Sequence, residues 1–166
     1  MANSTFDNIV SEIRSFALRA GGFASLQQFS VHLIAERLPH YDWVGFYMLD
    51  PDDDRMLVLG PFCGAPTGHF RIPVTEGICG AAVAQGQTVL VDDVSADPRY
   101  LACSIETRSE IVVPIRKNGM IAGEIDIDSH TLSAFGPEDR DFLEQCAGVL
   151  GEFLEKREES ERTHAG

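Results

Sequence analysis

The chain has 166 residues, of which 44% are hydrophobic and 23% are charged, values typical of a folded protein with one domain or two small ones. Its 26 acidic and 13 basic side chains give a formal net charge of -13, which argues against binding to nucleic acid or to an anionic membrane surface. No apolar run approaches the ~20 residues that span a bilayer, and the first residues lack the pattern of a secretion signal, so we expect a cytoplasmic protein.

The first part of the chain predicts two amphipathic helices. Apolar side chains recur at helical spacing over residues 5–20, and Gly21 and Gly22 end this run. A second helical stripe covers residues 24–38 and stops before Pro39, which cannot continue a helix.

The middle of the chain predicts short elements separated by turns. Strands are expected in residues 43–49, 56–60, 69–73 and 88–94. The acidic loop 50–55 joins the first two strands, and Thr75 is a candidate N-cap for a small helix that ends at Gly86. The stretch 95–109 is rich in proline and polar residues, which predicts an irregular segment.

A hairpin and a final helix complete the pattern. Two apolar runs, residues 110–115 and 120–128, flank the dipeptide Asn118-Gly119, which is the strongest short-range hairpin signal. Pro137 then begins a helix with one apolar stripe.

Helices at both ends therefore bracket a mostly antiparallel sheet, which is the pattern of a single α+β domain. We place this domain in residues 1–157 and expect the charged tail 158–166 to be disordered. The apolar stripes of the terminal helices pack either on the sheet or on a second copy of the chain, which would make a homodimer.

Acidic residues gather on one face of the predicted hairpin. The strand period of two puts Glu124, Asp126 and Asp128 on the same side of residues 120–128. Glu110 begins the partner strand, so antiparallel pairing brings it to the Asp126 and Asp128 end. The pattern fits either a polar face in contact with solvent or a functional site with a wall around it.

Aromatic residues offer such a wall. Trp43, Gly45 and Tyr47 alternate with Val44 and Phe46 along the first strand, so the two sets face opposite sides. Core packing is the alternative explanation for these aromatic side chains.

Four cysteines, Cys63, Cys79, Cys103 and Cys146, form no CxxC pair and have no histidine at zinc-finger spacing, so we expect no structural zinc site. Cys103 lies in the turn-rich segment, where a thiol has the partial exposure that reactivity requires. Cys79 falls in the first turn of the small helix, Cys146 lies on the apolar stripe of the last helix, and the role of Cys63 is undetermined.

Seven short motifs together resemble the free methionine-(R)-sulfoxide reductases, a family built on the GAF fold. In chain order they are WVGFY, LVLGPF, RIPV, GICG, LAC, SEIVVPI and DIDS. The match covers roughly residues 40–155, and the pair SEIVVPI and DIDS is more specific than generic GAF features.

The resemblance implies a GAF-like fold, with a six-stranded antiparallel sheet and a small pocket for one free amino acid. It also implies the reduction of free methionine-R-sulfoxide to methionine. By motif position, the nucleophilic cysteine of the family falls on Cys103 and a second cysteine falls on Cys79. The acids of the family fall on Glu110, Asp126 and Asp128.

In the reaction that this resemblance implies, the Cys103 thiolate attacks the sulfoxide sulfur while Glu110 or Asp128 supplies a proton to the oxygen. Asp126 is expected to hold the substrate ammonium.

Trp43 and Tyr47 are expected to enclose the methyl group. The sulfenic acid left on Cys103 condenses with a second thiol, and an external dithiol such as thioredoxin reduces the resulting disulfide. No metal ion or organic cofactor is expected to take part.

The sequence departs from the family pattern at one thiol. His69 stands where the family usually has its resolving cysteine, before the RIP motif. Cys63 lies upstream of that place and is a candidate resolving thiol if the loop folds back. The alternative is that another thiol reduces the sulfenic acid directly. Two alternatives to the enzyme are a non-catalytic GAF sensor of an amino-acid-like ligand and a module that only dimerises through its terminal helices.

Overall fold

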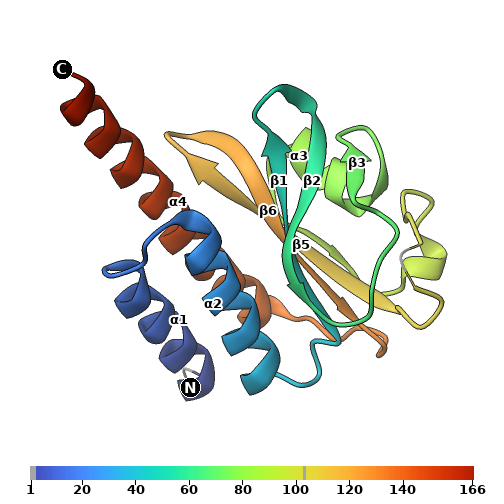
Figure 1. Cartoon of the computed structure of the whole chain (residues 1–166). Helices are drawn as coiled ribbons and strands as arrows, with labels where there is room; N and C mark the ends of the chain where they lie inside the picture. The colour runs from blue at the N-terminus through green and yellow to red at the C-terminus, as the bar shows by residue number, and fades with distance from the viewer. Residues whose placement is uncertain (1–2, 103) are drawn as a thin grey trace.

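A six-stranded antiparallel sheet forms the centre of the protein (Figure 1). The computed structural model describes residues 3–102 and 104–166. The strands lie in the order β3-β2-β1-β6-β5-β4. Along the chain they are β1 (Trp43–Asp50), β2 (Asp53–Cys63), β3 (Arg71–Pro73), β4 (Val89–Val91), β5 (Ser109–Lys117) and β6 (Met120–Ser129).

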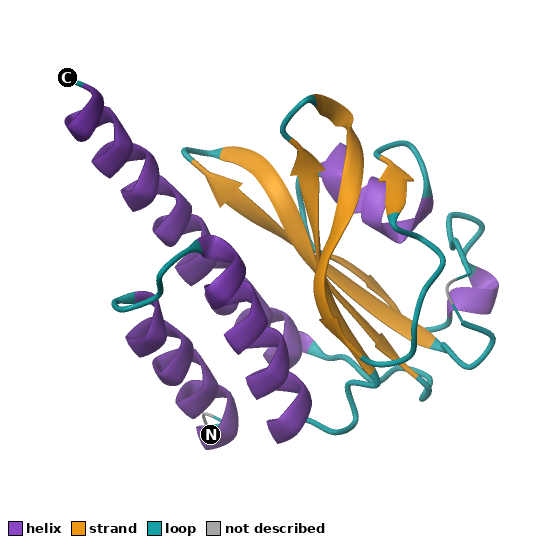
Figure 2. Cartoon of the chain, viewed as in Figure 1, coloured by secondary structure: helices purple, strands orange, loops and turns teal. Residues whose placement is uncertain are grey.

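Helices cover both faces of this sheet. They are α1 (Ser4–Ala17), α2 (Phe23–Arg37), α3 (Gly77–Gln85) and α4 (Pro137–Ala165), together with the 3-10 turn η1 (Val94–Ala96). The helices α1, α2 and α4 pack on one face, and α3 lies on the other (Figure 2). The predicted α+β class and the six-stranded antiparallel sheet are confirmed.

The alternation along β1 divides the interior into two cores. Val44 and Phe46 point into the large core that α1, α2 and α4 cover. Trp43 and Tyr47 point to the other face, into the smaller core beneath α3. The site described below lies on this second face.

The last helix is longer than the sequence indicated. The sequence predicts a domain that ends at residue 157 and a disordered tail, but α4 continues to Ala165. Glu158 contributes to the extension, because it bonds to Arg162 one turn further along at 2.6 Å and to Lys117 of the hairpin at 3.2 Å.

Smaller differences concern the ends of elements. Strand β2 begins at Asp53, so the acidic loop is a tighter turn than expected, and Asp50 pairs with Asp53. The N-cap of α3 is Glu76, so the prediction that Thr75 caps this helix was wrong. Within the described residues, no helix is long and apolar enough to cross a lipid bilayer.

Two glycines of α4 give a matched test of how closely this helix packs on β5. A Cβ atom at Gly151 would fall well inside van der Waals contact with the carbonyl oxygen of Arg116, whereas one at Gly148 would meet nothing within 4 Å. We expect Gly151→Ala to lower the free energy of unfolding by about 1–3 kcal/mol. Gly148→Ala should raise it by about 0.5–1 kcal/mol, because alanine is the better helix former. Urea unfolding measures both, and equal effects would contradict the close contact.

Candidate functional site

Strand pairing arranges the acids in neighbouring rows across the sheet. Trp43 of β1 pairs with Asp128 of β6, which pairs with Glu110 of β5. In the next row Asp126 lies between Gly45 and Val112, and in the third row Glu124 lies between Tyr47 and Pro114. The antiparallel register therefore brings the four carboxyl groups to one face of the central strands.

These acids are not a polar face in contact with solvent. The exposed fraction is 0% for Glu124, 2% for Asp126 and 5% for both Glu110 and Asp128. Carboxyl groups are rarely buried without a partner, because removing their charge from water is costly. The burial excludes the first interpretation of the pattern and supports a functional one.

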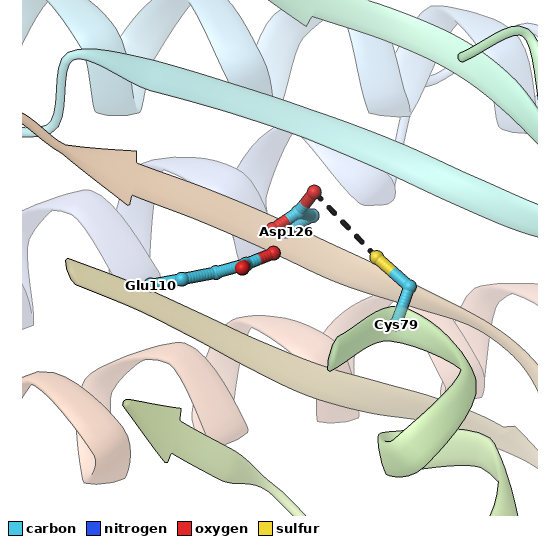
Figure 3. A group of neighbouring side chains, drawn as sticks. All are labelled: Cys79, Glu110 and Asp126. Carbon is cyan, nitrogen blue, oxygen red and sulfur yellow. Dashed lines mark hydrogen bonds between the residues drawn. The ribbon is translucent and has the colours of Figure 1, made fainter. Parts of the chain in front are cut away.

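Helix α3 adds a thiol to this cluster. Its first turn places Cys79 over the sheet, where the thiol donates a hydrogen bond to Oδ2 of Asp126 at 3.6 Å (Figure 3). One potential ligand atom from each of Cys79, Glu110 and Asp126 lies within 4.8 Å of the others. Cys79 is only 4% exposed, so the thiol and the acids share one buried space.

Several carboxyl oxygens in this space have no hydrogen-bond partner among the described residues. They are Oδ1 of Asp126, Oδ1 of Asp128 and both oxygens of Glu124. A buried polar atom without a partner costs free energy, so such atoms mark a place where a ligand, an ion or water completes the bonding.

Burial also changes the protonation of the cluster. Desolvation raises the pKa of Asp126 to about 6, although hydrogen bonds from Glu110 and Cys79 oppose the shift. Desolvation, together with the charge of Asp126, raises the pKa of Asp128 well above its usual value. Burial also raises the pKa of Glu124 and the pKa of the Cys79 thiol well above their usual values. At neutral pH the site therefore offers an ionised Asp126 beside neutral carboxyl groups that can donate a proton.

Aromatic side chains form one wall beside the acids. The Trp43 ring stacks on Tyr47 and on Phe62, with centroid distances of 6.3 Å and 5.5 Å. Gly45 makes this possible, because a Cβ atom there would overlap the Trp43 ring.

Hydrogen bonds to the loop after β2 hold these rings in place. The indole Nε1 of Trp43 donates to the carbonyl of Ala65 at 3.1 Å, and the Tyr47 hydroxyl donates to the carbonyl of His69 at 2.8 Å. Trp43 and Asp128 line a small cavity of about 50 Å³ at this end of the site. Four larger hollows among the described residues lie elsewhere, and none of these four is lined by the buried acids.

The thiols expected from the sequence are not all together. Cys103 lies outside the described residues. Cys63 pairs with Val44, so it lies on the opposite face of the sheet, where its Sγ is 3.1 Å from Nδ1 of His32 in α2. The structure therefore does not bring Cys63 to the acid cluster.

The sequence did not indicate a functional role for two features of the site. The strand period placed Glu124 on the acidic face, but only the structure shows that this side chain is fully buried beside Cys79. The second feature is a contact at 2.9 Å between Nε2 of His69 and the carbonyl of Ala102, which joins two loops far apart in the sequence. No local pattern encodes such a contact between loops.

Comparison with known proteins identifies the family. The sequence model of the GAF domain matches residues 27–153. The free methionine-R-sulfoxide reductase of Escherichia coli is 41% identical over 122 residues, which cover 74% of this chain and 72% of that protein. This chain belongs to the free methionine-R-sulfoxide reductase family.

Other relatives agree with this assignment. Protein YtsP of Bacillus subtilis is 43% identical over 122 residues, which cover 74% of each chain. The X-ray structure of the free methionine-R-sulfoxide reductase of Neisseria meningitidis, solved in complex with its substrate, matches with a TM-score of 0.88 and 33% identity. That match covers 96% of this chain and 95% of the other, so the helices at both ends are shared with the reductase fold.

The buried acids predict a characteristic dependence of stability on pH. Folding raises the pKa of Asp126 to about 6, so the folded chain holds this proton more tightly than the unfolded chain does. The resulting stabilisation is complete below about pH 4 and is lost as the pH rises through about 6. Urea unfolding at pH 4.5 and pH 7.5 should show that Asp126→Asn loses about 2 kcal/mol less than the wild type over this interval. The exposed control Asp52→Asn should follow the wild type, and parallel profiles for all three proteins would contradict the assignment.

Proposed function

We propose that this protein reduces free methionine-R-sulfoxide to methionine, with Cys103 as the nucleophile. The observation that carries the proposal is the buried cluster of acids with unpartnered oxygens beside the aromatic wall, in a chain 41% identical to a reductase of that name. Such a pocket suits one small zwitterion that brings its own positive charge.

The residues divide the binding between the two ends of the substrate. Asp126, the acid with the pKa of about 6, holds the ammonium group in its ionised form. The stacked rings of Trp43 and Tyr47 enclose the methyl group at the sulfur end. A methionine sulfoxide residue inside a peptide chain lacks the free ammonium, and the rest of the chain does not fit into a buried pocket, so the site selects the free amino acid.

In the reaction, the Cys103 thiolate attacks the sulfur while Asp128 or Glu110 donates a proton to the sulfoxide oxygen. The raised pKa of Asp128 supports its role as the neutral donor. The hydroxyl group formed on the oxygen then passes from the substrate sulfur to the Cys103 sulfur as the transient sulfur–sulfur bond breaks, so that methionine leaves and Cys103 is left as a sulfenic acid.

Recycling needs a second thiol, and Cys79 is the better placed candidate among the described cysteines. It lies among the acids, whereas Cys63 faces the other side of the sheet. The Cys79 thiol attacks the sulfenic sulfur, water leaves, and a disulfide forms. Since burial and the acids raise its pKa, Cys79 needs a proton acceptor, and the ionised Asp126 already accepts its hydrogen bond.

The proposal also includes an external reductant for the disulfide and a homodimeric assembly. A thioredoxin-like dithiol in the cytoplasm would reduce the disulfide, because a reducing compartment keeps such bonds transient. A homodimer would use the groove between α1 and α4, where Leu18 is 84% exposed beside Phe153.

The direct test measures methionine released from the separate R and S forms of free methionine sulfoxide in excess dithiothreitol. We expect release from the R form alone, its loss in Cys103→Ser, and its retention in Cys146→Ser, whose thiol lies in the other core. With thioredoxin as the reductant, Cys79→Ser should be slower than Cys63→Ser.

Binding without methionine release in the wild type would instead indicate a non-catalytic sensor. If the protein neither binds nor reduces the sulfoxide, the result would support the third interpretation, a module that only dimerises.

A further inference from the structure

The cluster around Cys79 holds more acidic groups than one substrate ammonium needs. The sulfur of Cys79 and one carboxyl oxygen each from Glu110 and Asp126 lie within 4.8 Å of one another (Figure 3). All three side chains are at least 95% buried. A thiol is a poor partner for an ammonium group but a good ligand for a thiophilic metal ion, so the place of Cys79 beside these acids suits metal binding in addition to its proposed role in recycling.

Glu124 supplies an independent observation. Its side chain is 0% exposed, and neither of its oxygens has a hydrogen-bond partner among the described residues. It lies within hydrogen-bonding reach of Cys79, but the thiol hydrogen goes to Asp126. A buried carboxyl group without a donor therefore lies beside the same sulfur that donates its hydrogen to Asp126.

We propose that this cluster binds a thiophilic divalent cation such as Zn²⁺, with Cys79, Glu110 and Asp126 as its ligands and the unpartnered carboxyl group of Glu124 beside Cys79 as a further ligand once the ion is bound. One sulfur and up to three carboxyl oxygens suit Zn²⁺ or Co²⁺, which accept sulfur and oxygen in a four-coordinate site. Mg²⁺ and Ca²⁺ prefer oxygen ligands alone and need more of them, so the thiol selects against both ions.

The ion acts as an inhibitor in this proposal and not as a cofactor. Asp126 is also the residue proposed to hold the substrate ammonium, so metal and amino acid exclude each other. This consequence rests on the proposed function, whereas metal binding itself does not. Free zinc would then stop the reductase reversibly and would protect Cys79 from oxidation while it is bound.

The first experiment measures binding of ZnCl₂ to the full-length reduced protein by titration calorimetry, with a phosphine as reductant. We expect one ion per chain, with affinity lowered about tenfold or more in Cys79→Ser and clearly lowered in Glu124→Gln. The matched control Cys63→Ser should bind as the wild type does, because that thiol lies on the opposite face. Loss of binding in Cys63→Ser, with binding retained in Cys79→Ser, would overturn the proposal in favour of the Cys63 and His32 pair.

A second measurement guards against a variant that fails to fold. The double variant Cys63→Ser/Cys103→Ser keeps Cys79 and the core residue Cys146. On addition of Co²⁺ it should show the near-ultraviolet charge-transfer band of a thiolate bound to cobalt. Absence of this band, or absence of one-to-one zinc binding by the wild type, overturns the proposal.

Competition separates this proposal from the proposed function. Free L-methionine should weaken zinc binding if both occupy Asp126. Zinc binding that depends on Cys79 but does not respond to L-methionine or to the sulfoxide would support the metal site and contradict the proposed ammonium site.

Discussion

The rest of the site depends on one constraint, which is the burial of carboxyl groups on β6 beneath α3. No cationic side chain among the described residues compensates them. Such groups destabilise the empty protein, because their charge is removed from water and several oxygens lack a donor. The same cost makes the site receptive to a cation of the right size. It also raises the pKa of Asp126 and Asp128, which places both a proton donor and an anion near neutral pH.

The two faces of the sheet divide stability from chemistry. On one face, α1, α2 and α4 bury a large apolar core that includes Val44, Phe46 and Cys146. On the other face, the smaller core beneath α3 gives way to acids and a thiol. Burial of apolar surface in the larger core stabilises the fold and offsets the free energy of unfolding that the polar cluster removes. The alternation of side chains along the strands keeps the two environments on opposite faces of one sheet.

Much of this could be predicted because it follows from periodicity. The period of two placed Asp126 and Asp128 on one face, and the Asn118-Gly119 turn fixed the register that brings Glu110 opposite Asp128. The same alternation placed Trp43 and Tyr47 together as an aromatic wall. The family motifs added the expected roles of Cys79 and Cys103.

What could not be predicted depends on contacts between segments far apart in the sequence. The side of the sheet on which Cys63 lies follows from its pairing with Val44, which no local pattern shows. The ion pair between Lys117 and Glu158 joins the hairpin to the extended part of α4, and the link between His69 and Ala102 depends on how two loops meet. Whether Glu124 is exposed or buried was equally undecided until α3 was placed over it.

The central claim is that the buried acids recognise the free ammonium group of a methionine-like zwitterion. Titration calorimetry with L-methionine-R-sulfoxide and with its N-acetyl derivative tests this claim most directly, because acetylation replaces the charged ammonium group with a larger neutral amide and leaves the sulfoxide unchanged. The Asp126→Asn variant removes the opposite charge without any change in ligand size. We expect the free amino acid to bind the wild type, and we expect binding to be lost both on acetylation and in the Asp126→Asn variant. Equal affinity for the free and the acetylated sulfoxide would contradict the account.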